Sequence, residues 1–171
     1  VKLWEVENGA ELATLRGHRG PAECLAFSHD GKRLASGGAD RTIRIWNTEI
    51  HPERTRIRLP AWSIHDVAFT SAGQLLMASD YTRVWLIDAK TNHVTKDWPT
   101  NHWTHASAIA PDGSMVVTAG DKNSRGGGGP MIRLWSVDDS SQPKDLETSL
   151  DKVVHVEFSK DGLTLLGQCC N

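Results

Sequence analysis

The 171-residue sequence offers little covalent support for a fold, because it contains only three cysteines. They are Cys24, Cys169 and Cys170, and an odd, sparse set with two adjacent members makes no disulfide framework. We therefore expect a fold that does not rely on disulfide bridges, and a reducing compartment, the cytoplasm.

The sequence also lacks long apolar runs and a large excess of charge of either sign. No apolar stretch approaches the roughly 18 residues of a membrane-spanning helix, and no signal peptide is visible. The first residue is Val1 rather than Met, so we expect the natural N-terminus to lie further upstream. The formal net charge is -2, which argues against general binding to nucleic acid or to anionic membranes.

Catalytic and metal-binding motifs are scarce as well. The run Gly126–Gly129 is not followed by the Gly-Lys-Ser/Thr of a phosphate-binding loop. His102 and His105, with Asp121 further along the chain, have no evident fourth ligand for a metal ion. We therefore expect no catalytic, cofactor-binding or metal site, and a protein that is not an enzyme.

The aromatic composition is biased toward tryptophan, with seven tryptophans, three phenylalanines and one tyrosine. This imbalance indicates that tryptophan recurs at a repeated position. Trp4, Trp46, Trp85 and Trp135 are separated by steps of 42, 39 and 50 residues. Four turns ending in glycine keep the same rhythm, with steps of 42, 40 and 49 residues between Gly31, Gly73, Gly113 and Gly162. A glycine-rich insertion at 124–130 explains why the last step is long in both series.

A period of about 40–45 residues is typical of the four-stranded blade of a β-propeller. The first period contains four short apolar or alternating runs, as strands do: Ala22–Phe27, Arg33–Ser36, Thr42–Trp46 and Arg54–Leu59. No stretch shows a helical period. We expect an all-β fold of sixteen strands, with three complete units between two half units.

The stretch from Gly17 to Asn47 resembles a WD repeat. It has a Gly-His pair, an Asp-Gly turn, the run LASGGADRTIRIW and a final Trp followed by a polar residue. The terminal dipeptide of the family is Trp-Asp, and this chain has Trp46-Asn47 instead. The resemblance implies a β-propeller whose segments are a half-blade at 1–15, blades at 16–59, 60–98 and 99–150, and a half-blade at 151–171. Repeats of this kind are similar to those of large bacterial WD-repeat proteins, where they can accompany kinase or other signalling domains.

The resemblance further implies a hydrogen-bonded tetrad of Trp46, Ser36, His18 and Asp40 in the first complete blade. The chemistry is reasonable, because a buried indole N–H needs an acceptor and a neutral imidazole can link a hydroxyl to a carboxylate. In the other blades we place different residues at the His, Ser and Trp positions: Pro60, Ala78 and Trp85, then Thr100, Thr118 and Trp135. We expect those two blades to lack the tetrad and to depend on core packing alone.

Propellers of this family usually bind partners through loops that gather on one face. Six large residues fall in these loops: Arg19, Arg41, Trp62, Tyr81, Trp103 and Arg125. Tryptophan, tyrosine and arginine are enriched in interface hot spots. The leading hypothesis is a non-catalytic scaffold that binds other proteins or peptides, and not nucleic acid or a membrane. The alternative is a propeller enzyme or small-ligand binder with a site in the central channel.

Members of the family commonly have seven or eight blades, so we expect an incomplete arc of such a ring. Two alternatives fit the same strand arithmetic. One is a closed four-blade ring in which the two half-blades complete each other, and the other is a dimer that forms an eight-blade ring with shared blades. An open arc would expose apolar faces and unpaired strand edges, which favours self-association.

Overall fold

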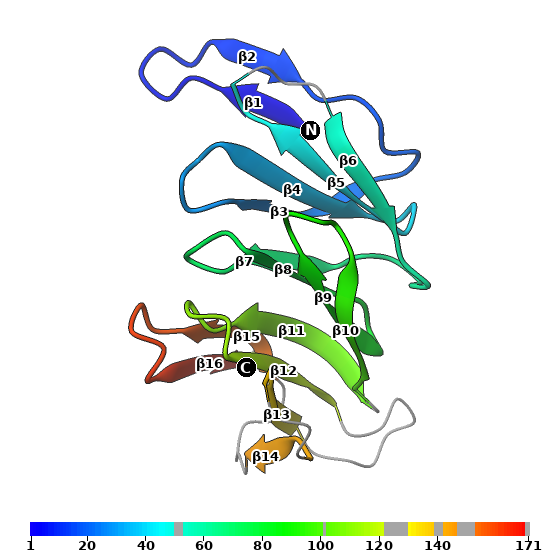
Figure 1. Ribbon diagram of the computed structural model, residues 1–171, viewed down its shortest axis with the longest axis vertical. Coiled ribbons are helices and arrows are strands. Elements are labelled where there is room, and N and C mark those ends of the chain that lie inside the picture. The colour runs from blue at the N-terminus through cyan, green and yellow to red at the C-terminus, as the bar shows by residue number, and fades with distance from the viewer. Residues whose placement is uncertain (50–52, 101, 122–129, 139–141, 147–152, 170–171) are drawn as a thin grey trace.

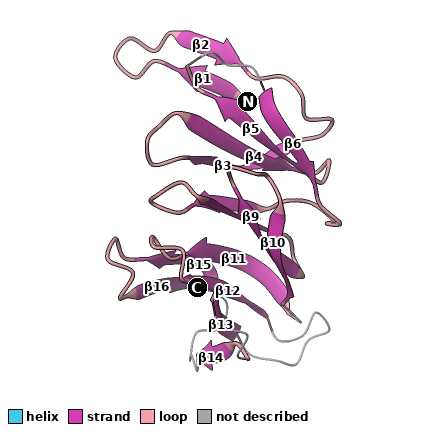
Figure 2. Cartoon of the chain, viewed as in Figure 1, coloured by secondary structure: helices cyan, strands magenta, loops and turns pink. Residues whose placement is uncertain are grey.

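The computed structural model describes residues 1–49, 53–100, 102–121, 130–138, 142–146 and 153–169, and every regular element in these ranges is a β-strand (Figures 1 and 2). The sixteen strands form five antiparallel sheets, three with four strands and two with two strands. The predicted class, all-β with four-stranded antiparallel blades in an incomplete propeller, is confirmed.

The strands follow the chain in simple up-and-down order within each blade. The N-terminal half-blade consists of β1 (Lys2–Trp4) and β2 (Glu11–Thr14). The first blade consists of β3 (Ala22–Phe27), β4 (Arg33–Gly38), β5 (Thr42–Asn47) and β6 (Glu53–Arg58). The second blade consists of β7 (Asp66–Phe69), β8 (Leu75–Ser79), β9 (Arg83–Asp88) and β10 (Val94–Pro99). The third blade consists of β11 (Trp103–Ile109), β12 (Met115–Asp121), β13 (Pro130–Ser136) and β14 (Lys144–Leu146). The C-terminal half-blade consists of β15 (Val153–Phe158) and β16 (Leu165–Cys169).

The predicted glycine turns join the first and second strands of the blades. Gly31 and its three counterparts all have a positive φ, between 65° and 80°, which a residue without Cβ adopts at little cost. Each of these glycines donates its backbone N–H to the carbonyl three residues earlier, at 2.7–2.9 Å. The same turn, repeated four times, therefore sets the position of each second strand.

Side chains between neighbouring sheets form the core, because each strand directs alternate residues to opposite faces. Ile43 and Ile45 of the first blade pack with Trp85 and Ile87 of the second. Met77 and its neighbours in the second blade pack in the same way against the third, and the two half-blades pack against the first and third blades. Neighbouring blades therefore pack against each other through apolar surfaces.

The sheets are stacked one after another in an open arc (Figure 1). The two half-blades remain separate two-stranded sheets, with the N-terminal one against the first blade and the C-terminal one against the third. The alternative of a four-blade ring closed by its own half-blades is therefore wrong for this chain. In the described ranges no helix has the length and hydropathy to cross a membrane.

Candidate protein-interaction face

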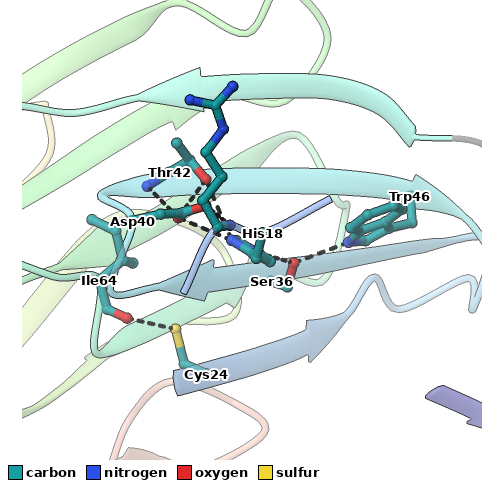
Figure 3. A network of polar contacts seen from close by, with 8 residues as sticks. His18, Cys24, Ser36, Asp40, Thr42, Trp46 and Ile64 are labelled. Atoms are coloured by element: carbon teal, nitrogen blue, oxygen red, sulfur yellow. Dashed lines mark hydrogen bonds and ion pairs between the residues drawn. The ribbon is translucent and has the colours of Figure 1, made fainter. Parts of the chain in front are cut away.

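Trp46, Ser36, His18 and Asp40 form one continuous chain of hydrogen bonds in the first blade (Figure 3). Trp46 Nε1 donates to Ser36 Oγ at 2.9 Å, and His18 Nε2 lies 2.8 Å from the same hydroxyl. His18 Nδ1 lies 3.0 Å from Asp40 Oδ1. A carboxylate can only accept, so Nδ1 carries the proton and Nε2 accepts from Ser36. The chain runs from the third strand through the second to the loop that leads into the blade.

Asp40 also fixes the backbone of two loops. Its Oδ2 accepts from the Arg19 amide at 2.9 Å, and its Oδ1 accepts from the Thr42 amide and hydroxyl at 3.2 and 2.7 Å. Burial disfavours the ionised carboxyl, but the hydrogen bonds from Arg19, Thr42 and His18 outweigh it and hold the pKa of Asp40 well below its usual range. Asp40 therefore anchors Arg19 and Arg41 in a defined position.

The second blade has an aspartate, Asp80, that accepts hydrogen bonds as Asp40 does in the first blade. The expectation that this blade depends on core packing alone is therefore wrong. The buried Asp80 accepts from the Trp62 amide at 3.2 Å and from the Thr82 and Arg83 amides at 2.7 Å. The arrangement repeats that of Asp40, with Trp62 in the place of Arg19. Asp80 thus holds the inter-blade loop of the second blade against its own turn.

The tryptophan of the second blade is out of register with Trp46, so its predicted equivalence is wrong. Trp46 lies opposite Leu34, and the matching pair in the second blade is Ile87 opposite Leu76. Trp85 lies opposite Ala78, in the position that Arg44 has in the first blade. The Trp85 ring is buried, and its Nε1 has no acceptor among the described residues.

The third blade has the tryptophan-to-hydroxyl hydrogen bond of the first blade. Trp135 Nε1 donates to Thr118 Oγ1 at 3.1 Å, as Trp46 does to Ser36. Thr100 does not continue this chain, because its hydroxyl donates to the carbonyl of His102 at 2.9 Å. The Trp135–Thr118 hydrogen bond stabilises the third blade in addition to its core. The expectation that this blade depends on core packing alone is therefore also wrong.

The two histidines of the third blade serve separate partners. His102 is buried and its Nδ1 lies 2.6 Å from the Thr100 carbonyl, while His105 Nε2 lies 2.9 Å from Asp121 Oδ2. Burial lowers the pKa of His102, which keeps its imidazole neutral as a donor to that carbonyl. In the part of the chain that the structure describes, no group of three or more potential metal ligands gathers.

Tyr81 and Trp103 lie together on the loop face. Their rings are stacked with centroids 4.6 Å apart, and the His65 ring contacts Tyr81 in a tilted arrangement with centroids 3.9 Å apart. His65 in turn pairs with Glu23 at 2.7 Å, and the Thr104 amide donates to the Tyr81 carbonyl at 2.7 Å. A ladder of rings therefore connects the loops of neighbouring blades.

Trp62 and Arg41 meet at a shallow pocket on the same face. The pocket is lined by Arg41, Pro60, Ala61 and Trp62 and has a volume of about 330 Å³. The Trp62 side chain is 77% exposed, although its backbone is held by Asp80. Arg41 is exposed and has a φ of 65°, an unusual conformation for a residue with a Cβ. A fixed backbone here carries a large exposed ring and an exposed cation.

The structure thus places five of the six predicted face residues, and Arg125 lies outside the described residues. Four of them, Arg19, Arg41, Trp62 and Tyr81, lie in the inter-blade loops and the loops between second and third strands, whereas Trp103 is the first residue of β11. These loops are on the right-hand side of Figure 1. Sequence reasoning missed the roles of Asp80 and His65. The Asp80 role could have been found, because an aspartate follows the second strand of the blade just as Asp40 does.

The first strand of the second blade, β7, carries a half-buried acid, Asp66. Asp66 Oδ2 accepts from the Ser107 hydroxyl at 2.9 Å, and Ser107 Oγ lies 2.8 Å from Ser79 Oγ. Burial raises the pKa of the Asp66 carboxyl, and the Ser107 hydrogen bonds oppose this effect. These polar atoms are used to connect the second and third blades.

Comparison with known proteins places this geometry in a family. The sequence profile described as WD domain, G-beta repeat, matches residues 9–47, which run from β2 through the first three strands of the first blade. This chain therefore contains a WD repeat at residues 9–47. The sequence repeat is offset from the blade, because β2 belongs to the preceding half-blade.

The proteins that this chain matches are much longer, and the matches span only 6–13% of the three described here. It is 49% identical over 47 residues to a periodic tryptophan protein 2 homolog of Schizosaccharomyces pombe, covering 28% of this chain and 6% of that protein. It is 24% identical over 167 residues to human apoptotic protease-activating factor 1, covering 97% of this chain and 12% of that protein. It is 43% identical over 47 residues to the bovine serine-threonine kinase receptor-associated protein, covering 28% of this chain and 13% of that protein.

Proposed function

We propose that this WD-repeat chain is a non-catalytic scaffold that binds another protein or a peptide through the loop face. WD-repeat relatives point to interaction scaffolds in general, and two of the matched proteins are named for acting on or associating with other proteins, a protease and a kinase receptor. We further propose that the loop face is the surface that binds the partner. The observation that carries it is the combination of exposed side chains with fixed backbone at Trp62 and Arg41.

Two physical features support this choice of surface. Asp40 and Asp80 hold the amides of Arg19 and Trp62, so little backbone entropy remains to be lost when a partner orders the loops. Tyr81 and Trp103 stack on one another, and the exposed Arg19 and Arg41 carry positive charge, which together suit a partner with apolar and acidic side chains.

A peptide-display selection against the folded chain tests the proposal. We expect selected peptides to bind wild type, and to lose at least about tenfold in affinity when Arg41, Trp62 and Trp103 are changed to alanine, which corresponds to about 1.4 kcal/mol. A matched triple variant, Lys32→Ala, Lys90→Ala and Lys160→Ala, changes exposed residues at turns away from the loop face and should bind as wild type does. Equal binding by the two triple variants would remove the loop face from consideration.

A further inference from the structure

The outer strands of the three complete blades differ in charge at one equivalent position. This position lies opposite the third-strand residue that pairs with Ser36 in the first blade, and with its counterparts in the other two. It holds Arg56 on β6, Asp97 on β10 and Asp145 on β14. The first blade therefore carries a cation where the other two carry a carboxylate.

The carboxylates of the other two blades pair with arginines of the neighbouring third strand. Asp145 lies opposite Arg133, whose Nη2 donates to Asp145 Oδ2 at 2.9 Å, and Asp97 pairs with an arginine of β9. In the first blade the residue opposite Arg56 is Arg44, so arginines occupy both positions. A partner that brings a carboxylate to Arg56 would reproduce the pairing that the other blades form internally.

Arg58 extends this positive charge along the same face of β6. Arg56 and Arg58 are two residues apart, and Ile57 between them points the other way, into the core shared with the second blade. Both arginines are exposed, and neither makes an ion pair or a side-chain hydrogen bond with any residue that the structure describes. Asp40 and Glu49 of the same blade already have partners of their own. The two guanidinium groups are therefore available to a carboxylate of another molecule.

The strand β6 ends beside the shallow pocket of the loop face. The Leu59 amide donates to the Arg41 carbonyl at 3.1 Å, so Arg58 lies next to the turn that carries Arg41. The chain then continues directly into residues 60–62, which line the pocket together with Arg41. We call Arg41, Arg56 and Arg58 the basic strip. It leads from the outer strand of the first blade to the exposed tryptophan of the pocket.

We propose that the basic strip and the pocket bind an extended acidic segment of a protein partner. Carboxylates of this segment pair with Arg56 and Arg58, and an apolar side chain lies on Trp62. Arginine holds a carboxylate through two parallel N–H donors, as the Arg133–Asp145 pair does. The net charge of -2 disfavours nucleic acid, and a pocket with an exposed tryptophan suits a side chain. The acidic segment depends on the proposed function, because its apolar anchor lies on the loop face.

Peptides selected by display on the folded wild type test the chemistry of the partner. We expect them to be enriched in aspartate and glutamate around an apolar residue, relative to the unselected library. A fluorescein-labelled selected peptide should lose at least about tenfold in affinity, measured by fluorescence anisotropy, when its acidic residues are replaced by the corresponding amides. Its affinity should also fall as salt rises from about 0.1 to about 1 M, because the Debye length shortens from about 10 to about 3 Å. Selected peptides without acidic enrichment would overturn the proposal.

A double charge reversal on β6 tests the place of binding. Arg56→Asp with Arg58→Asp should weaken binding of the same labelled peptide at least about tenfold. The variant should fold with the circular dichroism spectrum of wild type, because Arg56→Asp places a carboxylate opposite Arg44, as Asp145 lies opposite an arginine in the third blade. Arg56→Gln with Arg58→Gln, which adds no negative charge, should weaken binding in the same direction.

Lys90→Asp with Lys144→Asp is the matched control, because it makes the same change of net charge at exposed residues of the other two blades. It should bind the peptide as wild type does. Full binding by the β6 double variant, when the triple alanine variant of the loop face has lost it, would overturn the acidic partner and leave the proposed function standing. Full binding by both variants would overturn both. A labelled single-stranded DNA oligonucleotide that binds wild type as tightly as the peptide would assign the basic strip to nucleic acid and overturn the protein partner.

Discussion

Four side chains of the first blade show how single residues hold a small sheet to the loop beside it. Trp46, Ser36 and His18 each contribute a polar atom that would be orphaned without the next, and Asp40 ends the chain with a carboxylate. An unsatisfied buried polar group costs about 1–3 kcal/mol, so the loss of any member is felt by its neighbours.

His18→Ala should therefore destabilise the fold by roughly 2–3 kcal/mol, since it removes two hydrogen bonds and leaves Ser36 and Asp40 each without one partner. His105→Ala is the matched control, because His105 has a single pairing with Asp121 and a partly exposed ring. Its loss should cost about 1 kcal/mol or less. Urea unfolding followed by tryptophan fluorescence measures both values. If both variants lost the same free energy of unfolding, the hydrogen-bonded chain through His18 would contribute no more to stability than the single His105–Asp121 pairing.

The connection between the second and third strands differs in length between the first and second blades. In the first blade Asp40 accepts from the Thr42 amide within this turn and from the Arg19 amide of the preceding inter-blade loop. In the second blade Asp80 accepts from the Thr82 and Trp62 amides in the same way, although the turn is one residue shorter between paired positions. For Asp40, the hydrogen bonds that it accepts favour the ionised form of the carboxyl over the protonated form.

Asp40→Asn should remove a stabilisation that depends on pH. Hydrogen bonds hold the folded pKa of Asp40 below its unfolded value of about 4, so the carboxylate stabilises the fold above that pH. This contribution decreases below about pH 4 and is lost as the pH falls through the folded pKa. The difference in free energy of unfolding between wild type and Asp40→Asn should be largest at neutral pH and should shrink on acidification. A difference that stays constant from neutral to strongly acidic pH would contradict this assignment, and the exposed Asp138→Asn should show little difference throughout.

At the scale of the whole molecule, polar contacts between blades supplement the apolar faces. Arg33 of the first blade donates to the carbonyls of Gly73 and Ala89 in the second, at 2.6 and 3.4 Å, and lies 5.2 Å from the centre of the Phe69 ring. Ser107 and Asp66 connect the second and third blades in a similar way. These contacts help to set how one blade sits on the next.

Arg33→Met should cost about 2 kcal/mol, because it keeps the aliphatic stem but removes the charged donor between the blades. Lys32→Met is the control at the neighbouring position, where the side chain is exposed and its 3.7 Å pairing with Glu49 is worth about 0–1 kcal/mol. Thermal unfolding of the three chains measures the difference. If Lys32→Met lowers the melting temperature as much as Arg33→Met does, the contact between blades is not the reason.

Much of the architecture could be read from local pattern. Gly31 and its counterparts mark turns with a positive φ, and alternation along Thr42–Trp46 marks a strand. That alternation predicts one buried face, but both faces of β5 are buried because a sheet packs on each side of it. Such features depend on a residue and its near neighbours, so a linear sequence displays them. The match of the WD profile to residues 9–47 rests on the same local features.

The positions of Trp85 and Asp80 were decided by tertiary structure. The turn before β9 is one residue shorter than its counterpart in the first blade, which puts Ile87 rather than Asp88 in the place of Trp46. Trp85 lies two residues before Ile87 and is buried on the same face of the strand. The sequence shows an aspartate after the second strand in both blades, but only the fold brings the Trp62 amide to Asp80. By itself the sequence determined the number of strands and the rhythm of their turns. Only the folded chain decided which polar groups are paired and which apolar side chains pack together, because both depend on how neighbouring sheets pack in space.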